Sequence, residues 1–290
     1  MVTLRRVGRR AAGLMAGCLM VGSVAAYEQP LLFRGELALG YDSNVANASA
    51  SGDRRSDTFA EAVFSVNRLY TAGLFLSMEL EGSLRARSYR DYDRLSHVAP
   101  EALLRINYRP AGGFHTPTLS GWTSWEHRES RSELRDGSIH RVGASWRQPL
   151  TTRITGRLNG RYAWRRADNT VFDHEFRTLG VELEWEPVSS LVVYGGVSRR
   201  QGALVTVGGD NPDRKAASRA WLADDAFADA GEEQLAYRLS DSARQYTLGV
   251  NHALGSATSL EVQWQYLDAQ GSYGAGYRRW IALVAMAHAF

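Results

Sequence analysis

Apolar and polar residues alternate along most of the chain between Leu31 and Phe290, in segments of about ten residues. In the clearest segment, from Leu74 to Arg87, every second residue is apolar or glycine, and most of the residues between them are polar or charged. Successive side chains of an extended strand point to opposite faces, so this period of two predicts strands with one apolar face. About ten residues is also the length that a tilted strand needs to cross a bilayer.

The same pattern predicts about twelve strands, an even number that is typical of single-chain bacterial barrels. We expect them near residues 31–42, 57–67, 72–90, 97–109, 116–127, 138–148, 152–166, 174–186, 191–200, 242–254, 259–268 and 277–290. Short turns alternate with mostly longer loops, of which 201–241 is the longest. Short periplasmic turns and longer external loops are typical of outer-membrane barrels, whereas a soluble β-sandwich gives no reason for the alternation. The expected fold is all-β: an antiparallel up-and-down transmembrane β-barrel, closed between its first and last strands.

The last strand, from Tyr277 to Phe290, has two distinct faces. One face holds Trp280, Ala282, Val284, Met286, His288 and Phe290, and the other holds Arg279, Ile281, Leu283, Ala285, Ala287 and Ala289. A chain that ends on phenylalanine after such a strand resembles the C-terminal strand of Gram-negative outer-membrane β-barrels. The resemblance implies that this strand pairs with the first strand and that the barrel assembly machinery recognises Phe290. Taken alone, the strand also fits a buried last strand of a soluble β-protein.

Residues 1–26 have the three parts of a secretory signal peptide. A basic region is followed by an apolar region from Ala11 to Val21 and by the small-residue cleavage site Val24-Ala25-Ala26. The apolar region is too short for a spanning helix, which needs about 20 residues. We therefore expect cleavage after Ala26 and export to the outer membrane of a Gram-negative bacterium. Cys18 raises the alternative of a lipoprotein, which Met15 and the shortened apolar region disfavour.

Removal of the signal peptide changes the charge balance. The four arginines of residues 1–26 leave 30 Lys and Arg beside 31 Asp and Glu, so basicity gives no reason to expect nucleic-acid binding. Cys18 is the only cysteine, so the exported chain has neither a disulfide nor a thiolate metal ligand. We expect no metal site and no cofactor.

The polar faces of the predicted strands would line the lumen of the barrel. The charged residues expected there are Glu79, Glu81, Arg85, Glu101, Arg105, Arg153, Arg157, Arg161, Arg165, Glu182, Glu184 and Glu186. Folding the two hairpins places Arg161 near Glu182, Arg157 near Glu186, Arg85 near Glu101 and Glu81 near Arg105, give or take one register step. One interpretation is a selectivity ladder that guides an anionic solute such as an acidic oligosaccharide. The other is a structural network of ion pairs that fills or lines a narrow barrel.

The connection 201–241 is the most distinctive soluble feature. It contains a turn cluster at Gly208 to Pro212 and an alanine-rich, acidic stretch from Lys215 to Ala230, where a short amphipathic helix is expected. Trp221, Asp224, Asp225 and Phe227 are the candidates for a gating segment that enters the pore or covers its mouth. A solvated surface loop is the alternative.

Gly40 to Val45, with the sequence Gly-Tyr-Asp-Ser-Asn-Val, closes the first predicted strand. This stretch resembles one in the barrels of the surface lipoprotein assembly modifier family and of outer-membrane proteins of polysaccharide export. The resemblance implies a conduit in the outer membrane. Locally, the turn-forming side chains of Asp42, Ser43 and Asn44 are sufficient to explain the run.

An enzyme would need a catalytic constellation. Outer-membrane phospholipase, another twelve-stranded barrel, has a serine two residues after a histidine, and no histidine of this sequence is followed by serine at that distance. Three histidines fall near external strand ends and close to polar partners, which leaves an omptin-like or esterase site as an alternative. These residues are His127, His140 and His174, with Glu126, Ser138 and Asp173.

The pattern favours a passive channel or export conduit for small polar solutes or saccharides over an enzyme. The runner-up is a non-conducting barrel with a closed lumen, whose external loops bind a partner or display a surface structure. The expected partners are outer-membrane lipid and lipopolysaccharide, the barrel assembly machinery, and an anionic or saccharide solute.

Overall fold

The computed structural model describes residues 27–230, 233–271 and 275–290. The expected signal peptide and its cleavage at Ala26 lie outside these residues. Twelve strands of 11 to 19 residues form the barrel. They are β2 (Leu32–Asp42), β3 (Asp57–Ala72), β4 (Leu76–Tyr89), β5 (His97–Tyr108), β6 (Thr118–Ser130), β7 (Gly137–Pro149), β8 (Ile154–Ala167), β9 (His174–Val188), β10 (Leu191–Gly208), β12 (Leu235–Ala253), β13 (Thr258–Gln270) and β14 (Tyr277–Ala289).

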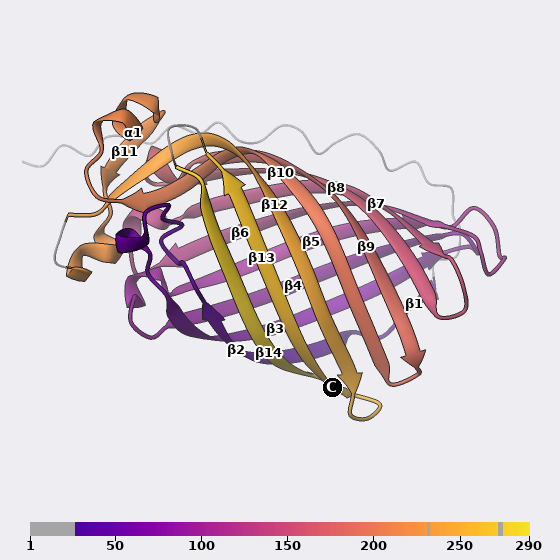
Figure 1. The fold of residues 1–290 in the computed structure, drawn as a ribbon. Coiled ribbons are helices and arrows are strands. Elements are labelled where there is room, and N and C mark those ends of the chain that lie inside the picture. The colour runs from indigo at the N-terminus through magenta and orange to yellow at the C-terminus, as the bar shows by residue number, and fades with distance from the viewer. Residues whose placement is uncertain (1–26, 231–232, 272–274) are drawn as a thin grey trace, which may run out of the picture.

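Each of these strands pairs antiparallel with its neighbours in the chain, and β14 pairs with β2 to close the barrel (Figure 1). The seam runs from Ile281 opposite Asp42 to Ala289 opposite Arg34. Two short strands are added to the barrel: β1 (Tyr27–Glu28) pairs with β3, and β11 (Ala220–Ala223) pairs with β12. The expected all-β closed barrel of about twelve strands is therefore confirmed.

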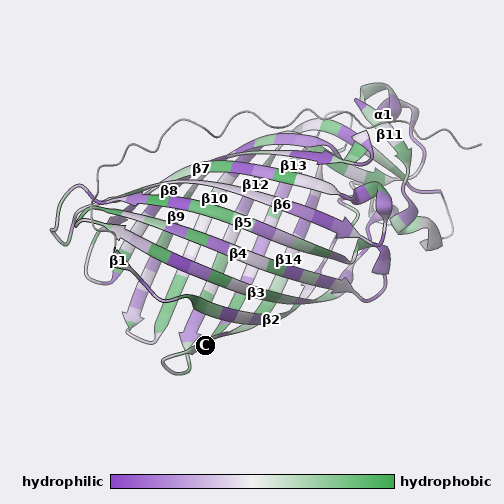
Figure 2. Cartoon of the chain, turned by 180° about the vertical axis from the view of Figure 1, so that it is seen from behind, coloured by the Kyte–Doolittle hydropathy of each residue, from purple (hydrophilic) through white to green (hydrophobic). Residues whose placement is uncertain are grey.

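The outer wall of the barrel is apolar. Leu37 is 63% exposed, Leu39 70% and Leu179 67%, and the outward tryptophans Trp185 and Trp264 are also exposed. Figure 2 shows hydrophobic and hydrophilic residues alternating along the strands, as side chains turn outward and inward in succession. A continuous belt of exposed apolar side chains is the surface that a barrel presents to lipid. Among the described residues, no helix is long and apolar enough to cross a membrane.

The longest connection is shorter than expected, because β10 continues to Gly208 and β12 begins at Leu235. β10 leaves β9 after the pair Gly202–Phe176, but β10 and β12 remain paired with each other as far as Gly208 opposite Leu235. The connection is therefore 209–234, not 201–241.

The helix expected in Lys215 to Ala230 is also misplaced. The α-helix, α1 (Pro212–Ala217), begins earlier, because the Asn211 side chain caps it by accepting a hydrogen bond from the Arg214 N–H. Residues 220–223 form β11 instead, since they pair with the exposed edge of β12. A 3₁₀ segment, Asp225–Ala230, follows.

The seam between β14 and β2 is marked by a buried ion pair. Asp42 is completely buried and accepts hydrogen bonds from the Arg279 guanidinium, with Nε 2.9 Å from Oδ1. Arg279 also donates to Asn47 Oδ1 at 3.0 Å. Asn44 closes the following turn: its side chain bonds to the backbone of Ala48 at both its oxygen and its nitrogen. The run Asp42-Ser43-Asn44 therefore supplies the acid of the seam ion pair and the side chain that closes the turn after β2.

We predict that Asp42→Asn destabilises the barrel by about 3 kcal/mol, because it leaves the largely buried Arg279 guanidinium without its anion. Urea unfolding of the refolded protein in phospholipid vesicles measures the loss. Arg34→Gln is the matched control at the same seam, since the Arg34–Glu36 pair is exposed and should cost at most about 1 kcal/mol. Equal stabilities for the two variants would contradict a role for the buried pair.

Candidate functional site

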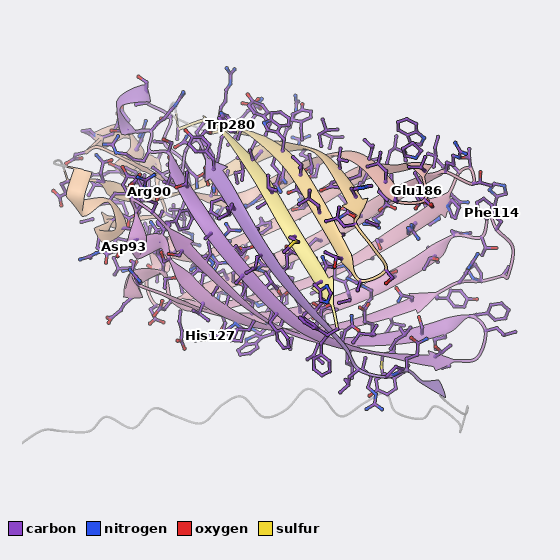
Figure 3. All side chains as sticks on the ribbon, turned by 90° about the horizontal axis from the view of Figure 1, so that it is seen from below. Arg90, Asp93, Phe114, His127, Glu186 and Trp280 are labelled. Atoms are coloured by element: carbon purple, nitrogen blue, oxygen red, sulfur yellow. The ribbon has the colours of Figure 1, made fainter. Side chains whose placement is uncertain are left out.

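A cavity of about 920 Å³ occupies the part of the lumen near the short turns. Its wall comes from strands β3 to β10 and from β12, and it is mainly polar. Five arginines face it, together with Trp122 and several serine, threonine and asparagine side chains. These arginines are Arg105, Arg109, Arg147, Arg157 and Arg161. The short turns and the external loops lie at opposite ends of the barrel, which Figure 3 marks with Phe114 and Glu186 at one end and Arg90 and Asp93 at the other.

Most arginines of the cavity wall are paired with carboxylates of neighbouring strands. Arg157 contacts Glu182 at 3.2 Å and Glu184 at 2.9 Å, and Arg147 contacts Glu184 at 3.1 Å. The hairpin turns about Asn169-Thr170, but its register differs by four residues from the expected one: Arg157 is opposite Glu182 rather than Glu186, and Arg161 is opposite Thr178 rather than Glu182. Such pairs are screened and partly exposed, so each contributes a few tenths to about 1 kcal/mol.

The β4–β5 hairpin differs from the expected register by two residues. Arg105 pairs with Glu79 at 2.9 Å rather than with Glu81. Glu101 pairs with Arg141 at 3.1 Å. Arg85 lies 3.9 Å from Glu61, a residue of β3 that the sequence pattern did not single out.

Two of the expected lumen residues lie at the exposed end of the barrel, and a third, Arg161, lacks its expected partner Glu182. Arg153 is exposed in the turn before β8 and is not on a strand, while Glu186 is exposed near the same end of the barrel. Arg161 lies on the lumen face, 5.7 Å from the centre of the Phe176 ring. Within the described part of the chain, Arg161 has no carboxylate partner. It is therefore an uncompensated positive charge at the inner end of the cavity.

Beyond Arg161, side chains fill the external half of the lumen. Glu126 is 2% exposed and pairs with Arg128 at 2.9 Å and with Arg141 at 2.6 Å. Arg165 is buried and donates to the backbone carbonyl of Arg135, and the Arg200 guanidinium lies 3.6 Å from the centre of the Phe176 ring. Sequence reasoning missed Glu126 and Arg141 as partners, although both occupy inward positions on neighbouring strands.

The external loops cover this filled half. We name them L1 (43–56), L2 (90–96), L3 (131–136), L4 (168–173), L5 (209–234) and L6 (271–276). The β10–β12 hairpin that carries L5 extends beyond the barrel wall, and α1 and β11 lie over its external end (Figure 1). The extension reaches L1, where the Val207 N–H donates to the Ala46 carbonyl at 2.9 Å, and L4, where Arg238 donates to the Thr170 carbonyl at 2.8 Å.

L5 is fastened to L2 and L3 by two adjacent aspartates. The fully buried Asp224 carboxylate pairs with Arg135, and Asp225 accepts hydrogen bonds from Ser132 and, at 3.0 Å, from Arg94. Burial raises the pKa of the Asp224 carboxyl, whereas Arg135 opposes that rise. We call Asp224, Asp225 and their partners Arg94, Ser132 and Arg135 the L5 latch.

A hydrophobic cluster accompanies the latch. Phe227 is 1% exposed and packs with Phe172 of L4, Ala46 of L1 and Val207 of β10. Trp221 differs from the other three candidate gating residues, because it is 48% exposed and lies under the Lys215 ammonium, 4.3 Å from its ring centre. L5 is therefore a packed cap on the external end, not a solvated surface loop.

The candidate hydrolase residues are split between the two sides of the wall. His127 Nδ1 lies 3.1 Å from Ser138 Oγ on the outer face, whereas Glu126 points into the lumen. Ser138 pairs with both His127 and Arg166 in the sheet, so the surrounding ladder occupies the backbone N–H groups that an oxyanion hole would need. His140 stacks on Trp164, and His174 contacts the Phe172 carbonyl near the lumen.

Comparisons with known proteins agree with this architecture. No family model matches the chain, and no curated protein matches it. The structure is similar to an outer-membrane channel from Pseudomonas putida F1, with 12% identity, a TM-score of 0.58, and coverage of 90% of this chain and 97% of that one. The chain has the fold of an outer-membrane β-barrel. The NanC porin also matches, with 10% identity over 89% of this chain and 99% of that one and a TM-score of 0.49.

We predict that Asp224→Asn loosens the cap, because the neutral amide leaves the buried Arg135 guanidinium without its anion. Amide hydrogen exchange of residues 220–230 should accelerate at least tenfold, while exchange in the barrel strands stays unchanged. Asp213→Asn is the matched control, since Asp213 is exposed in the same loop. Unchanged exchange in Asp224→Asn would show that the latch does not hold L5.

Proposed function

We propose that this protein is an outer-membrane channel for small polar solutes and that L5 closes its external mouth. The observation that carries the proposal is the polar cavity of about 920 Å³, which ends where buried side chains and the L5 cap fill the external half. A barrel built only as a scaffold gains nothing from a polar cavity of this size. The similarity to the Pseudomonas putida channel supports the same function.

The proposed solute is anionic or a saccharide. Arg161 supplies a positive charge without a carboxylate partner among the described residues, at the inner end of the cavity. Trp122 and the hydroxyl and amide side chains around it suit a polyhydroxylated molecule. Most other arginines of the wall are neutralised by glutamates, so we expect a modest anion preference. The resemblance of Gly40 to Val45 to barrels of polysaccharide export is compatible with this class of solute.

The alternative is a non-conducting barrel whose loops bind a partner. The observation that favours it is the dense packing of the external half, where Glu126 and Arg165 are buried beneath the loops. The two functions differ in one respect: a channel must open when the cap is removed.

We predict that replacing 209–234 with Asn-Gly opens the pore. Gly208 and Leu235 are directly paired, so a two-residue turn can connect them without disturbing the barrel. In planar bilayers, the intact protein should give rare or brief openings and the shortened protein steady conductance steps. Silence from both proteins, with folding verified by heat-modifiable electrophoretic mobility, would exclude the channel and leave the loop-binding alternative.

We predict that Arg161→Gln in the shortened protein shifts the reversal potential toward cation preference. The variant removes an uncompensated charge at the inner end of the cavity, whereas Arg153→Gln, in the exposed turn, should leave selectivity near that of the parent. The measurement is the reversal potential under a tenfold KCl gradient. An unchanged value for Arg161→Gln would mean that this arginine is structural.

A further inference from the structure

Three arginines lie on the outer face of the barrel near its external end. Arg199 of β10 is directly opposite Arg244 of β12. Arg177 of β9 is opposite Gln201, and is therefore a diagonal neighbour of Arg199. All three side chains are exposed. Arg177 and Arg199 lie within three residues of Gly202–Phe176, the last pair between β10 and β9. Arg244 lies two residues from Ser242–Gln270, the last pair between β12 and β13. We call Arg177, Arg199 and Arg244 the outer arginine triad.

The triad lacks compensating carboxylates. Arg177 donates to the Gln201 amide oxygen at 3.1 Å, and none of the three arginines has a carboxylate partner within the described part of the chain. Asp268 is directly opposite Arg244 but lies 3.6 Å from Arg278 instead. Like charges directly opposite each other in a sheet are destabilising, so the Arg199–Arg244 pair would be stabilised by an external anion.

A surface hollow of about 440 Å³ adjoins the triad. Arg177 and Arg199 line it together with further hydrogen-bonding side chains, which are Gln201, Ser240, Ser242 and Gln270. The hollow lies where the barrel wall ends, since Gly202–Phe176 and Ser242–Gln270 are the last pairs on either side of the β10–β12 hairpin. Guanidinium, hydroxyl and amide donors together form a set that suits phosphate oxygens.

Apolar side chains continue the same face toward the membrane. Leu179 is 67% exposed two residues from Arg177, and Leu248 is 55% exposed four residues from Arg244. Val197, two residues from Arg199, is 45% exposed. Charged donors above exposed apolar side chains match the two ends of an amphiphile that has an anionic headgroup and acyl chains. A free anion would use the donors but not the apolar surface.

We propose that the outer arginine triad and its hollow bind the phosphate-bearing headgroup of an outer-leaflet lipid of the lipopolysaccharide type, with the acyl chains lying on Leu179, Val197 and Leu248. This site is on the opposite side of the wall from the lumen cavity, and its occupancy does not depend on whether the pore conducts.

The test uses the refolded full barrel in detergent micelles and hexa-acylated diphosphoryl lipid A as the probe, with binding followed by native mass spectrometry. Arg199→Gln/Arg244→Gln should lower the apparent affinity at least tenfold. Arg90→Gln/Arg131→Gln is the matched control, because it removes two exposed external arginines outside the triad. The control should bind as the unchanged protein does, and heat-modifiable mobility verifies that each variant is folded.

Two further probes distinguish the source of the phosphate. Lipid A from which both phosphates have been removed should bind the unchanged protein at least tenfold more weakly, and inorganic phosphate at 10 mM should not displace diphosphoryl lipid A. Equal affinity of the triad variant and the control variant would overturn the site. Displacement by inorganic phosphate, or equal binding of dephosphorylated lipid A, would overturn the assignment to a phosphorylated lipid.

Discussion

The structure depends on one constraint: inside a bilayer, every backbone N–H and C=O group must find a partner within the protein. The pairing of β14 with β2 meets this constraint by removing the two edges that an open sheet would leave. In the middle of the seam the facing inner side chains are small, with Ala285 opposite Ala38, so backbone hydrogen bonds rather than interlocking side chains hold that stretch. Asp42 and Arg279 supply what the alanines cannot, because a buried ion pair distinguishes one register from its neighbours.

The strands and their faces could be predicted because a period of two is a local property of the sequence. The register of the hairpins could not, since a slip by two residues leaves every side chain on the same face of the sheet. Arg157 meets Glu182 rather than Glu186 for this reason: the two acids are four residues apart on β9 and point to the same side of the strand, so only the geometry of L4 selects between them. The ion pairs were therefore predictable as a class, while the individual partners were not.

The cap was harder to predict for a different physical reason. Residues 203–208 are mostly apolar or small on both faces, so they lack the alternation that marks a lipid-facing strand. Leu204 is buried against Ala243, Ala269 and Tyr277, whereas Val207 packs in the cluster of Phe172 and Phe227. Both faces of this segment are covered by protein, and the partners come from strands β12 to β14 on one face and from loops on the other. No local pattern carries that information.

The nearly neutral balance of residues 27–290 conceals a sorting of charge across the barrel wall. The acids of the lumen and of the cap form close ion pairs, such as Glu126 with Arg141 at 2.6 Å and Glu184 with Arg157 at 2.9 Å. On the outer face the pairs are longer, as for Arg166 with Glu175 at 3.4 Å, or are missing for the described outer arginine triad. A protein that neutralises most of its inner arginines and leaves outer ones without carboxylates concentrates positive charge where the headgroups of the outer leaflet lie. The same residue type therefore has two roles, set by whether a strand position turns inward to a carboxylate or outward to the lipid.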